Sequence, residues 1–366
     1  MKFPSGSLLL AFTLLGCRIQ QTKPVSGPFS AAELKQFSTL NPIDAHTHIF
    51  LSDPAFYATL KKLNIHILTI LVIDDTNPMR SNLFINDNKA WQVVHAGNGR
   101  VALCTTFDPY QFSQPGFVST AIRQINQDFD QGAVAVKIWK NIGMELTDAR
   151  GNYILPDDPR FEPIYQDIAA HNKTLIAHLA DPTSLWEAPN PQAPAYPYYK
   201  ANPQWYMYEK PRAPSKEQIL GARDHLLEQN PGLRVVGAHL GSREDDLNRL
   251  ARSLDCYPNF AVDLAGRVPD LAMHPRAEVI AFITRYQDRL IYGTDLEYGF
   301  GESEVNGQQL PWEYIYAGEW RFFATDDRLS YRGHVVRGLA LTHSILLKLY
   351  HENAIRWFPG LAAQFD

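Results

Sequence analysis

The sequence has few cysteines, no basic cluster and no long apolar segment, and each absence excludes a class of protein. Only Cys17, Cys104 and Cys256 occur among 366 residues, far apart from one another. This spacing does not indicate a disulfide framework or a thiolate metal site, although a single bridge between Cys104 and Cys256 stays open. The formal net charge is −5 and no run of Lys or Arg occurs, which argues against nucleic acid as a partner.

The apolar run Leu8–Leu15 is too short to span a bilayer as a helix, which takes about 20 apolar residues. Lys2 precedes the run and Gly16-Cys17 follows it, which resembles a bacterial lipoprotein signal in which Cys17 is lipidated. The alternative is an ordinary signal peptide with an incidental cysteine. We expect a signal peptide over 1–17, a polar tether with a short helix near 31–37 over 18–40, and one folded domain over 41–366. The protein would then be exported to the periplasm or the cell surface, with a lipid anchor as its membrane contact.

From residue 41 onward, apolar runs of strand length alternate with segments of helical spacing. The predicted strands are Ile43–Ile49, His66–Ile73, Arg100–Phe107, Ala133–Trp139, Thr174–Ala180, Arg234–Leu240, Asn259–Leu264 and Leu290–Asp295. The predicted helices are Ala55–Leu63, Ser81–His95, Phe117–Phe129, Phe161–His171, Ser215–Gln229, Arg243–Leu254, Arg276–Tyr286 and His334–Tyr350. Strands rich in Val, Ile, Leu and Ala are typical of parallel strands covered on both faces. Eight such units predict an α/β fold, a (β/α)₈ TIM barrel. An open doubly wound sheet is the alternative, but no Gly-x-Gly-x-x-Gly follows any of these strands.

Two connections are longer than the others and rich in aromatic residues. Asp181–Pro214 follows the fifth predicted strand and carries eight prolines, and Gly299–Ser330 follows the eighth. Their aromatic content argues against disorder. In a barrel both connections lie at the C-terminal face, where active sites are built. They either line or cover a site there, or cover hydrophobic surface or an oligomer contact.

Polar residues at the ends of the predicted strands suggest a metal site. Asp44, His46 and His48 are spaced by two, so an extended strand directs all three to one face, with Ile43 and Ala45 on the other. Two neutral imidazoles on one face can bind the same metal ion. Three further strand-end residues are expected at the same mouth of the barrel: His178, His239 and Asp295.

This arrangement resembles the amidohydrolase superfamily, and more narrowly amidohydrolase family 2. The resemblance covers essentially residues 42–358. It is carried by Asp44-Ala45-His46-Thr47-His48, Ala177-His178, Ala238-His239-Leu240-Gly241, Tyr292-Gly293-Thr294-Asp295 and Glu352-Asn353-Ala354-Ile355-Arg356-Trp357-Phe358. The family includes hydrolases, lactonases and metal-dependent decarboxylases, so the resemblance implies a metal-dependent enzyme.

The resemblance also implies roles for the strand-end residues. His46, His48 and His178 would supply nitrogen ligands, and Asp295 an oxygen ligand, to Zn²⁺ or a similar divalent ion. A metal lowers the pKa of its bound water to about 7, and Asp295 can take the proton as a general base. His239 either binds a second metal ion or stays unligated and polarises the substrate carbonyl, as in mononuclear members of the family.

Lys137 bears on the number of metal ions. It lies on the fourth predicted strand, where binuclear relatives place a carboxylated lysine that bridges two ions. It could instead be a charge near the substrate, or only neutralise Asp295 or Asp44. We expect one ion, or two if Lys137 is carboxylated.

Arg267 follows the seventh predicted strand and offers a fork suited to a substrate carboxylate. Together with Lys137 and Lys140 it suggests an acidic substrate. The alternative is an ion pair between Asp263 and Arg267 without a substrate role.

The leading hypothesis is a metal-dependent hydrolase that cleaves an amide or lactone bond of a small carbonyl compound. The first alternative is non-oxidative decarboxylation of an unsaturated or aromatic acid at the same site. The second is a non-catalytic exported binding protein that retains the barrel. The expected partner is a small-molecule substrate, and a homodimer is an open alternative for the assembly.

Overall fold

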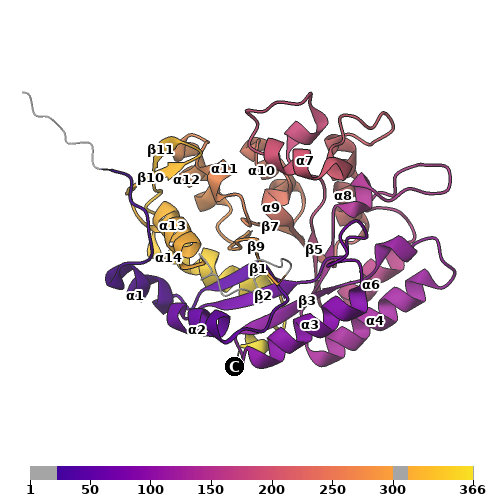
Figure 1. The fold of residues 1–366 in the computed structure, drawn as a ribbon, viewed down its shortest axis with the longest axis horizontal. Coiled ribbons are helices and arrows are strands. Elements are labelled where there is room, and N and C mark those ends of the chain that lie inside the picture. Colours follow the sequence, from indigo (N-terminus) through magenta and orange to yellow (C-terminus); the bar gives the residue numbers. More distant parts are fainter. Residues whose placement is uncertain (1–22, 300–311, 366) are drawn as a thin grey trace, which may run out of the picture.

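The computed structural model describes residues 23–299 and 312–365 (Figure 1). The signal peptide and Cys17 lie outside these residues. Within the described ranges, no helix is both long and apolar enough to cross a membrane.

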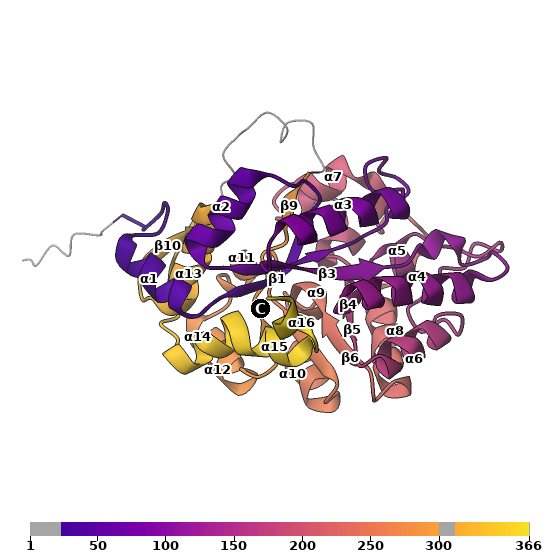
Figure 2. The same cartoon turned by 90° about the horizontal axis from the view of Figure 1, so that it is seen from below.

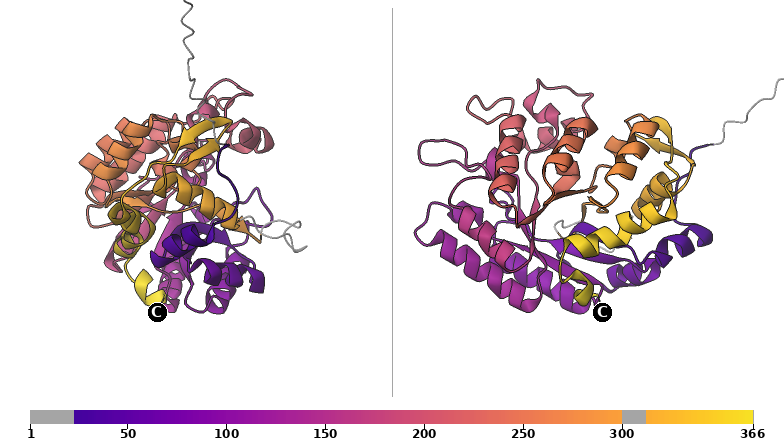
Figure 3. Two further views of the ribbon diagram at one scale, coloured as in Figure 1. Left: turned by 90° about the vertical axis from the view of Figure 1, so that its left-hand side faces the viewer. Right: turned by 180° about the vertical axis from the view of Figure 1, so that it is seen from behind.

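The core of the fold is one parallel sheet. Its strands are β1 (Ile43–Ile49), β2 (His66–Ile70), β3 (Val101–Thr106), β4 (Ala135–Ile138), β5 (Thr174–Ala177), β6 (Arg234–Gly237), β7 (Phe260–Asp263), β8 (Leu290–Ile291) and β9 (Leu296–Tyr298). They neighbour one another in the order β8-β7-β6-β5-β4-β3-β2-β1-β9. Almost all strand residues are buried, as strands covered on both faces should be. The helices surround the strands in the views from the side and from behind (Figure 3).

The sheet closes on itself through the segment that holds β8 and β9. β8 pairs with β7, and the next residue, Tyr292, accepts a hydrogen bond of 3.0 Å from the backbone of Ala45. The Asp295 N–H then donates to the His46 carbonyl at 2.8 Å, and β9 pairs with β1. The TIM barrel is therefore confirmed, although the predicted strand Leu290–Asp295 is regular only at its first two residues.

The barrel interior is apolar at the end opposite the mouth. Residues of several strands, including Leu68, Ala102 and Ile176, form a buried cluster with Trp357 and Phe358 near the C-terminus. The view from below looks directly onto α15 (Asn353–Trp357) and α16 (Leu361–Gln364) (Figure 2). These helices plug the bottom, so the open end is the mouth where the strands end.

The prediction that side chains alternate strictly between the two faces of β1 is wrong. The pairing with β2 is irregular between Asp44 and Thr47. Ile43 and Ala45, expected to face outward, belong to the interior cluster. Asp44 instead bonds Thr294 and Tyr316. A bulge of this kind re-aims side chains along a strand.

The longer helices match the predicted segments within a few residues, apart from those described below. They are α1 (Ala31–Thr39), α2 (Pro54–Leu63), α3 (Leu83–Ala96), α4 (Phe117–Gln131), α6 (Glu162–Ala170), α8 (Lys216–Gln229), α10 (Leu247–Cys256) and α12 (Arg276–Arg285). The short helices are α5 (Asn141–Met144), α7 (Tyr196–Ala201), α9 (Ala238–Gly241) and α11 (Val268–Leu271). α8 begins with a capping box, in which the Ser215 hydroxyl accepts from the Gln218 N–H and the Gln218 side chain accepts in return from the Ser215 N–H.

The helix predicted over His334–Tyr350 is wrong in its first part. Residues Arg328–Tyr331 (β10) and His334–Arg337 (β11) form an antiparallel hairpin instead. The helical structure begins only with α14 (His343–Leu347) and continues through a π turn over Lys348–Glu352 into α15.

The connection predicted as a long loop after the eighth strand contains a helix, α13 (Trp312–Ala324). Trp312, Tyr316, Trp320 and Phe323 of this helix are buried. These rings cover hydrophobic surface, which is the second of the two roles expected for the connection.

The segment before β1 packs against this helix. Arg321 of α13 bonds the carbonyls of Gly27 and Pro28 and both carboxylate oxygens of Glu33. The short helix expected near 31–37 is α1, whose Phe37 is fully buried.

Candidate active site

A cavity of about 600 Å³ opens at the C-terminal ends of the strands. Its lining includes His48, His178, His239 and Asp295, together with Arg267. The long connection after β5 contributes Tyr198 and Trp205 to the wall, so the lining role expected for that connection is confirmed. The barrel thus brings together five of the residues that the sequence singles out.

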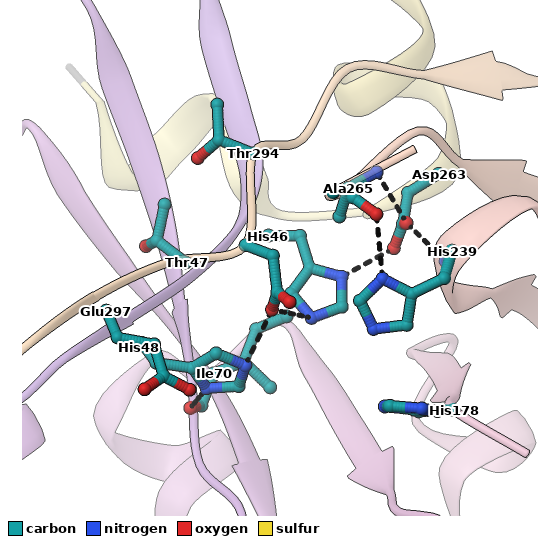
Figure 4. Close-up of polar contacts among 12 residues, drawn as sticks. His46, Thr47, His48, Ile70, His178, His239, Asp263, Ala265, Thr294 and Glu297 are labelled. Atoms are coloured by element: carbon teal, nitrogen blue, oxygen red, sulfur yellow. Dashed lines mark hydrogen bonds and ion pairs between the residues drawn. The ribbon is translucent and has the colours of Figure 1, made fainter. Parts of the chain in front are cut away.

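His46 is fully buried and held by a carboxylate from β7, which is separated from β1 by the segment that contains β8 and β9. Its Nδ1 lies 2.7 Å from Oδ2 of Asp263 at the end of β7 (Figure 4). Burial opposes ionisation of Asp263, but pairing with His46 lowers the pKa of this carboxyl to about 2. Burial, reinforced by Lys137, lowers the pKa of His46. A neutral ring that donates from Nδ1 leaves the lone pair at Nε2.

His48 and His239 are held in the same tautomer by backbone carbonyls. His48 Nδ1 lies 2.8 Å from the oxygen of Ile70, and His239 Nδ1 lies 2.7 Å from that of Ala265 (Figure 4). Because a carbonyl oxygen only accepts, each Nδ1 carries the proton. Burial holds the pKa of His239 well below its usual range. When neutral, both rings therefore present a lone pair at Nε2.

Asp295 faces these histidines from a left-handed turn. Its φ is +65°, a conformation that non-glycine residues adopt mainly where the surrounding structure enforces it. The preceding residue, Thr294, donates to Asp44 from both its backbone N–H and its hydroxyl. Gly293 allows the close approach, because a Cβ there would lie 2.8 Å from that of His46.

The Asp295 carboxylate completes a set of electron-pair donors. Its Oδ1 lies 3.5 Å from His46 Nε2 and 3.4 Å from His48 Nε2. Two lone pairs and an anionic oxygen so close together are favourable only with a cation among them.

The donor set fits a divalent metal ion. The ligand atoms of His46, His48 and Asp295 all lie within 4.8 Å of one another, and no other such group occurs among the described residues. Two imidazoles and a carboxylate match the ligand preferences of zinc and similar ions. Asp263 and Ile70 hold the ring nitrogens that face away, as outer partners of metal-binding histidines do.

His178 lies beside this group but outside it. Its ring packs edge-on against that of His239, with centroids 4.4 Å apart. Its Nε2 lies 3.1 Å from Asp181 Oδ1, and Asp181 is paired with Lys140 at 2.6 Å.

Lys137 does not line the cavity. It is fully buried in β4, and its Nζ lies 3.4 Å from His46 Nε2. Burial lowers the pKa of this lysine. Lys137 lies on β4, as the sequence predicts. Its contact with His46 places it beside the proposed metal ligands and not in the cavity where a substrate would bind.

The alternative pairing of Asp263 with Arg267 is wrong. Asp263 accepts hydrogen bonds from His46 and from the backbone N–H groups of His239 and Ala265. Arg267 lines the cavity, its buried Nε has no hydrogen-bond partner, and no ion pair joins it to a carboxylate of the described residues. Of the residues expected to contact an acidic substrate, Arg267 is therefore the remaining candidate, because Lys140 forms an ion pair with Asp181.

Two residues near the site have positions that the sequence did not reveal. Asp263 holds His46, and Asp181 holds His178. Asp181 follows His178 by three residues, which is a weak signal for contact. No local sequence pattern connects Asp263 with His46, which lies 217 positions away.

Comparisons with known proteins agree with this fold. The dihydroxybenzoic acid decarboxylase of Polaromonas sp. JS666, solved with bound manganese and 2-nitroresorcinol, is 12% identical, with a TM-score of 0.51 over 87% of this chain and 96% of that one. The 2,6-dihydroxybenzoate decarboxylase from Rhizobium is 14% identical, with a TM-score of 0.50 over 87% of this chain and 98% of that one. No curated protein matches the chain.

The sequence pattern of one family extends over nearly the whole domain. Residues 43–360 match the pattern described as Amidohydrolase. This range includes every strand of the barrel and all of the mouth residues described above. The chain therefore belongs to the amidohydrolase family and is an enzyme.

Proposed function

We propose that the protein is a metal-dependent hydrolase that cleaves an amide or lactone bond of a small carbonyl compound. One observation carries the proposal: Oδ1 of Asp295 faces the Nε2 atoms of His46 and His48 at 3.5 and 3.4 Å. These three residues would hold the ion, with His178 as a further ligand. The ion, Zn²⁺ or a similar divalent cation, would supply a water of lowered pKa.

Asp295 would accept the proton of the water. Asp295 is anionic, and 38% of its side chain is exposed, so it can reach a water in the cavity and accept its proton at a carboxylate oxygen. The Asp44–Thr294 contacts and the left-handed turn hold this carboxylate in place.

His239 would take part in the proton transfer from the lining of the same cavity. Its Nδ1–H is committed to Ala265, so the lone pair at Nε2 can accept a proton. Nε2 can polarise a substrate carbonyl only after it has gained that proton. The hydrogen bond therefore favours a role in which His239 would receive the water proton from Asp295 and then donate it to the leaving group.

Arg267 supports a second candidate on the same site, non-oxidative decarboxylation of an unsaturated or aromatic acid. Its guanidinium lacks a carboxylate partner and lines the cavity with His239 and Asp295. A free guanidinium binds a carboxylate in a two-pronged geometry. In the hydrolase, Arg267 would anchor a carboxylate remote from the scissile bond; in the decarboxylase it would orient the carboxylate that leaves.

The test is a screen of the metal-loaded enzyme against lactones, amides and aromatic acids, with ring opening, amine release and CO₂ release measured separately. Asp295→Asn should lower kcat by about 10²–10⁴-fold, the usual effect of losing a general base. His46→Ala should lose both metal and activity. His343→Ala removes an exposed histidine of α14 and should change neither. CO₂ release without hydrolysis would replace the first candidate by the second, and metal-free wild type after reconstitution would contradict both.

We also propose that the enzyme is exported and anchored through Cys17. The short apolar run followed by Gly16-Cys17 supports this proposal. Labelling with a fatty acid in a bacterial host should mark the wild type and not Cys17→Ser. Unlabelled wild type in the soluble fraction would contradict the anchor.

A further inference from the structure

His178 is oriented differently from the other three histidines at the mouth. His46, His48 and His239 are held through Nδ1, which leaves Nε2 for the site. His178 is held through Nε2, which lies 3.1 Å from Asp181 Oδ1. The free nitrogen of this ring is therefore Nδ1.

Asp181 is fixed as an acceptor by a buried lysine. Lys140 Nζ lies 2.6 Å from Oδ2, and the side chains of Lys140 and Asp181 are only 4% and 5% exposed. An ammonium group only donates, so Asp181 meets it as a carboxylate. The other oxygen, Oδ1, can then only accept, and the His178 proton must sit at Nε2.

Aromatic rings hold Lys140 in turn. Its Nζ lies 5.4 Å from the ring centre of Trp139, 4.6 Å from that of Tyr198 and 4.8 Å from that of Trp205. A cation over such rings is attracted by their negative faces. Tyr198 and Trp205 come from the long connection after β5, so this connection supports the interior of the site as well as its wall.

We propose that Asp181, held by Lys140, is a positioning residue that keeps His178 in the Nε2–H tautomer and makes Nδ1 its metal-binding atom. The proposal rests on the metal-dependent function proposed above. It predicts that a residue outside the coordination group sets the metal affinity. The competing interpretation is that Asp181 only neutralises Lys140.

The first test compares the Zn²⁺ and Mn²⁺ affinities of purified full-length variants by competition with a chromophoric chelator. Asp181→Ala should weaken binding by about 10–100-fold, the effect typical of losing an outer partner of a ligand. Asp181→Asn keeps one acceptor oxygen, which Lys140 requires, so its NH₂ group meets His178 Nε2 and forces the ring proton to Nδ1. It should therefore also weaken metal binding, and it replaces the alanine variant if that one does not fold.

A second buried ion pair provides the matched control. Lys216 and Glu244 lie 3.4 Å apart, with side chains 6% and 5% exposed, and no histidine ring nitrogen bonds to that carboxylate. Glu244→Gln should leave the metal affinity unchanged. A folded Asp181→Ala protein with wild-type affinity would overturn the proposal, as would an equal loss in Glu244→Gln.

The second test needs no metal. Imidazole ¹⁵N NMR of the metal-free wild type should show His178 as the Nε2–H tautomer, and Asp181→Ala should shift it towards a mixture. A wild-type Nδ1–H tautomer would overturn the proposal. If the wild type binds no metal but shows the expected tautomer, the proposed function fails while the positioning of His178 by Asp181 stands.

Discussion

Asp263 bonds to both His46, on β1, and His239, in the short helix α9 that follows β6. Its Oδ2 lies 2.7 Å from His46 Nδ1, and its Oδ1 accepts from the backbone N–H of His239 at 2.8 Å. One buried carboxylate thus sets the tautomer of a proposed metal ligand and the backbone position of a proposed catalytic residue. A substitution that breaks the contact with His46 but keeps the contact with His239 should lower the metal affinity without a large loss of stability.

Asp263→Asn should lower the metal affinity while changing the stability of the fold only a little. The amide oxygen can still accept from the backbone N–H groups of His239 and Ala265, but its NH₂ group then meets Nδ1 of His46. His46 would have to move its proton to Nε2, where the metal should bind. We expect metal affinity to fall about 10–100-fold and the free energy of unfolding to change by only about 1–2 kcal/mol. Chelator competition and urea unfolding measure the two quantities, with the exposed Asp255→Asn as control.

Gly293→Ala should disturb the metal group by steric contact alone. The added methyl group would lie 2.8 Å from His46 Cβ, closer than real carbon atoms approach. We expect weaker metal binding and a loss of about 1–3 kcal/mol of unfolding free energy, as for other overpacked sites. Gly318→Ala in α13 meets no atom within 4 Å and should stabilise the protein by about 0.5–1 kcal/mol. Equal stability and metal affinity in both variants would contradict the close packing around His46.

The metal content should be one ion per chain. Lys137 Nζ points at His46 Nε2 with no second group of metal ligands around it in the described residues. Elemental analysis after dialysis should therefore give a ratio near one, and intact mass should show an unmodified Lys137. Two ions together with a mass increase of one CO₂ would show that Lys137 is carboxylated and would contradict the expectation of a single ion.

Acid should weaken the contact between the N-terminal segment and α13. The bonds from Arg321 lower the pKa of Glu33 to about 2, whereas an unfolded glutamate titrates near 4.3. A depressed pKa stabilises the folded state above the unfolded value, and this stability is lost as the pH falls from about 4.5 towards 2. Glu33→Gln should cost about 1–3 kcal/mol at pH 7, reduced by its partial exposure.

Urea unfolding at several pH values measures this effect. The difference between wild type and Glu33→Gln should shrink as the pH falls below 4.5. Glu278→Gln, an exposed residue of α12, is the control and should show no such trend. A constant difference down to pH 3 would contradict the role given to the Glu33–Arg321 pair.

The sequence predicts the barrel well because its strands are short apolar runs buried on both faces. It predicts the hairpin β10–β11 poorly. Val335, Val336 and Leu339 have a helical spacing, and β11 shows no regular alternation of buried residues, so only the pairing with β10 reveals the strand. For the aromatic residues of α13 the sequence left open whether they line the mouth or cover hydrophobic surface, and most of them pack in the core.

The mouth residues can be predicted from their positions at strand ends, but their hydrogen-bond partners cannot. His46, His48 and Asp295 meet as expected. Asp44 was expected to share their face, yet the irregular pairing of β1 turns it towards Thr294 and Tyr316. The contacts of Asp263 with His46 and of Asp181 with Lys140 join segments distant in sequence, and only the closed barrel brings them together.

The closure of the barrel through residues 292–298 also determines when the site can form during folding. Asp44 and Thr294, whose contact steadies Asp295, are separated by 250 positions along the chain. Contacts between such distant segments are slow to form, because the intervening loop must first lose its entropy. A nascent chain that has not yet added its last strand would hold two histidines with no carboxylate opposite them. Capture of the ion should therefore mark the completion of folding.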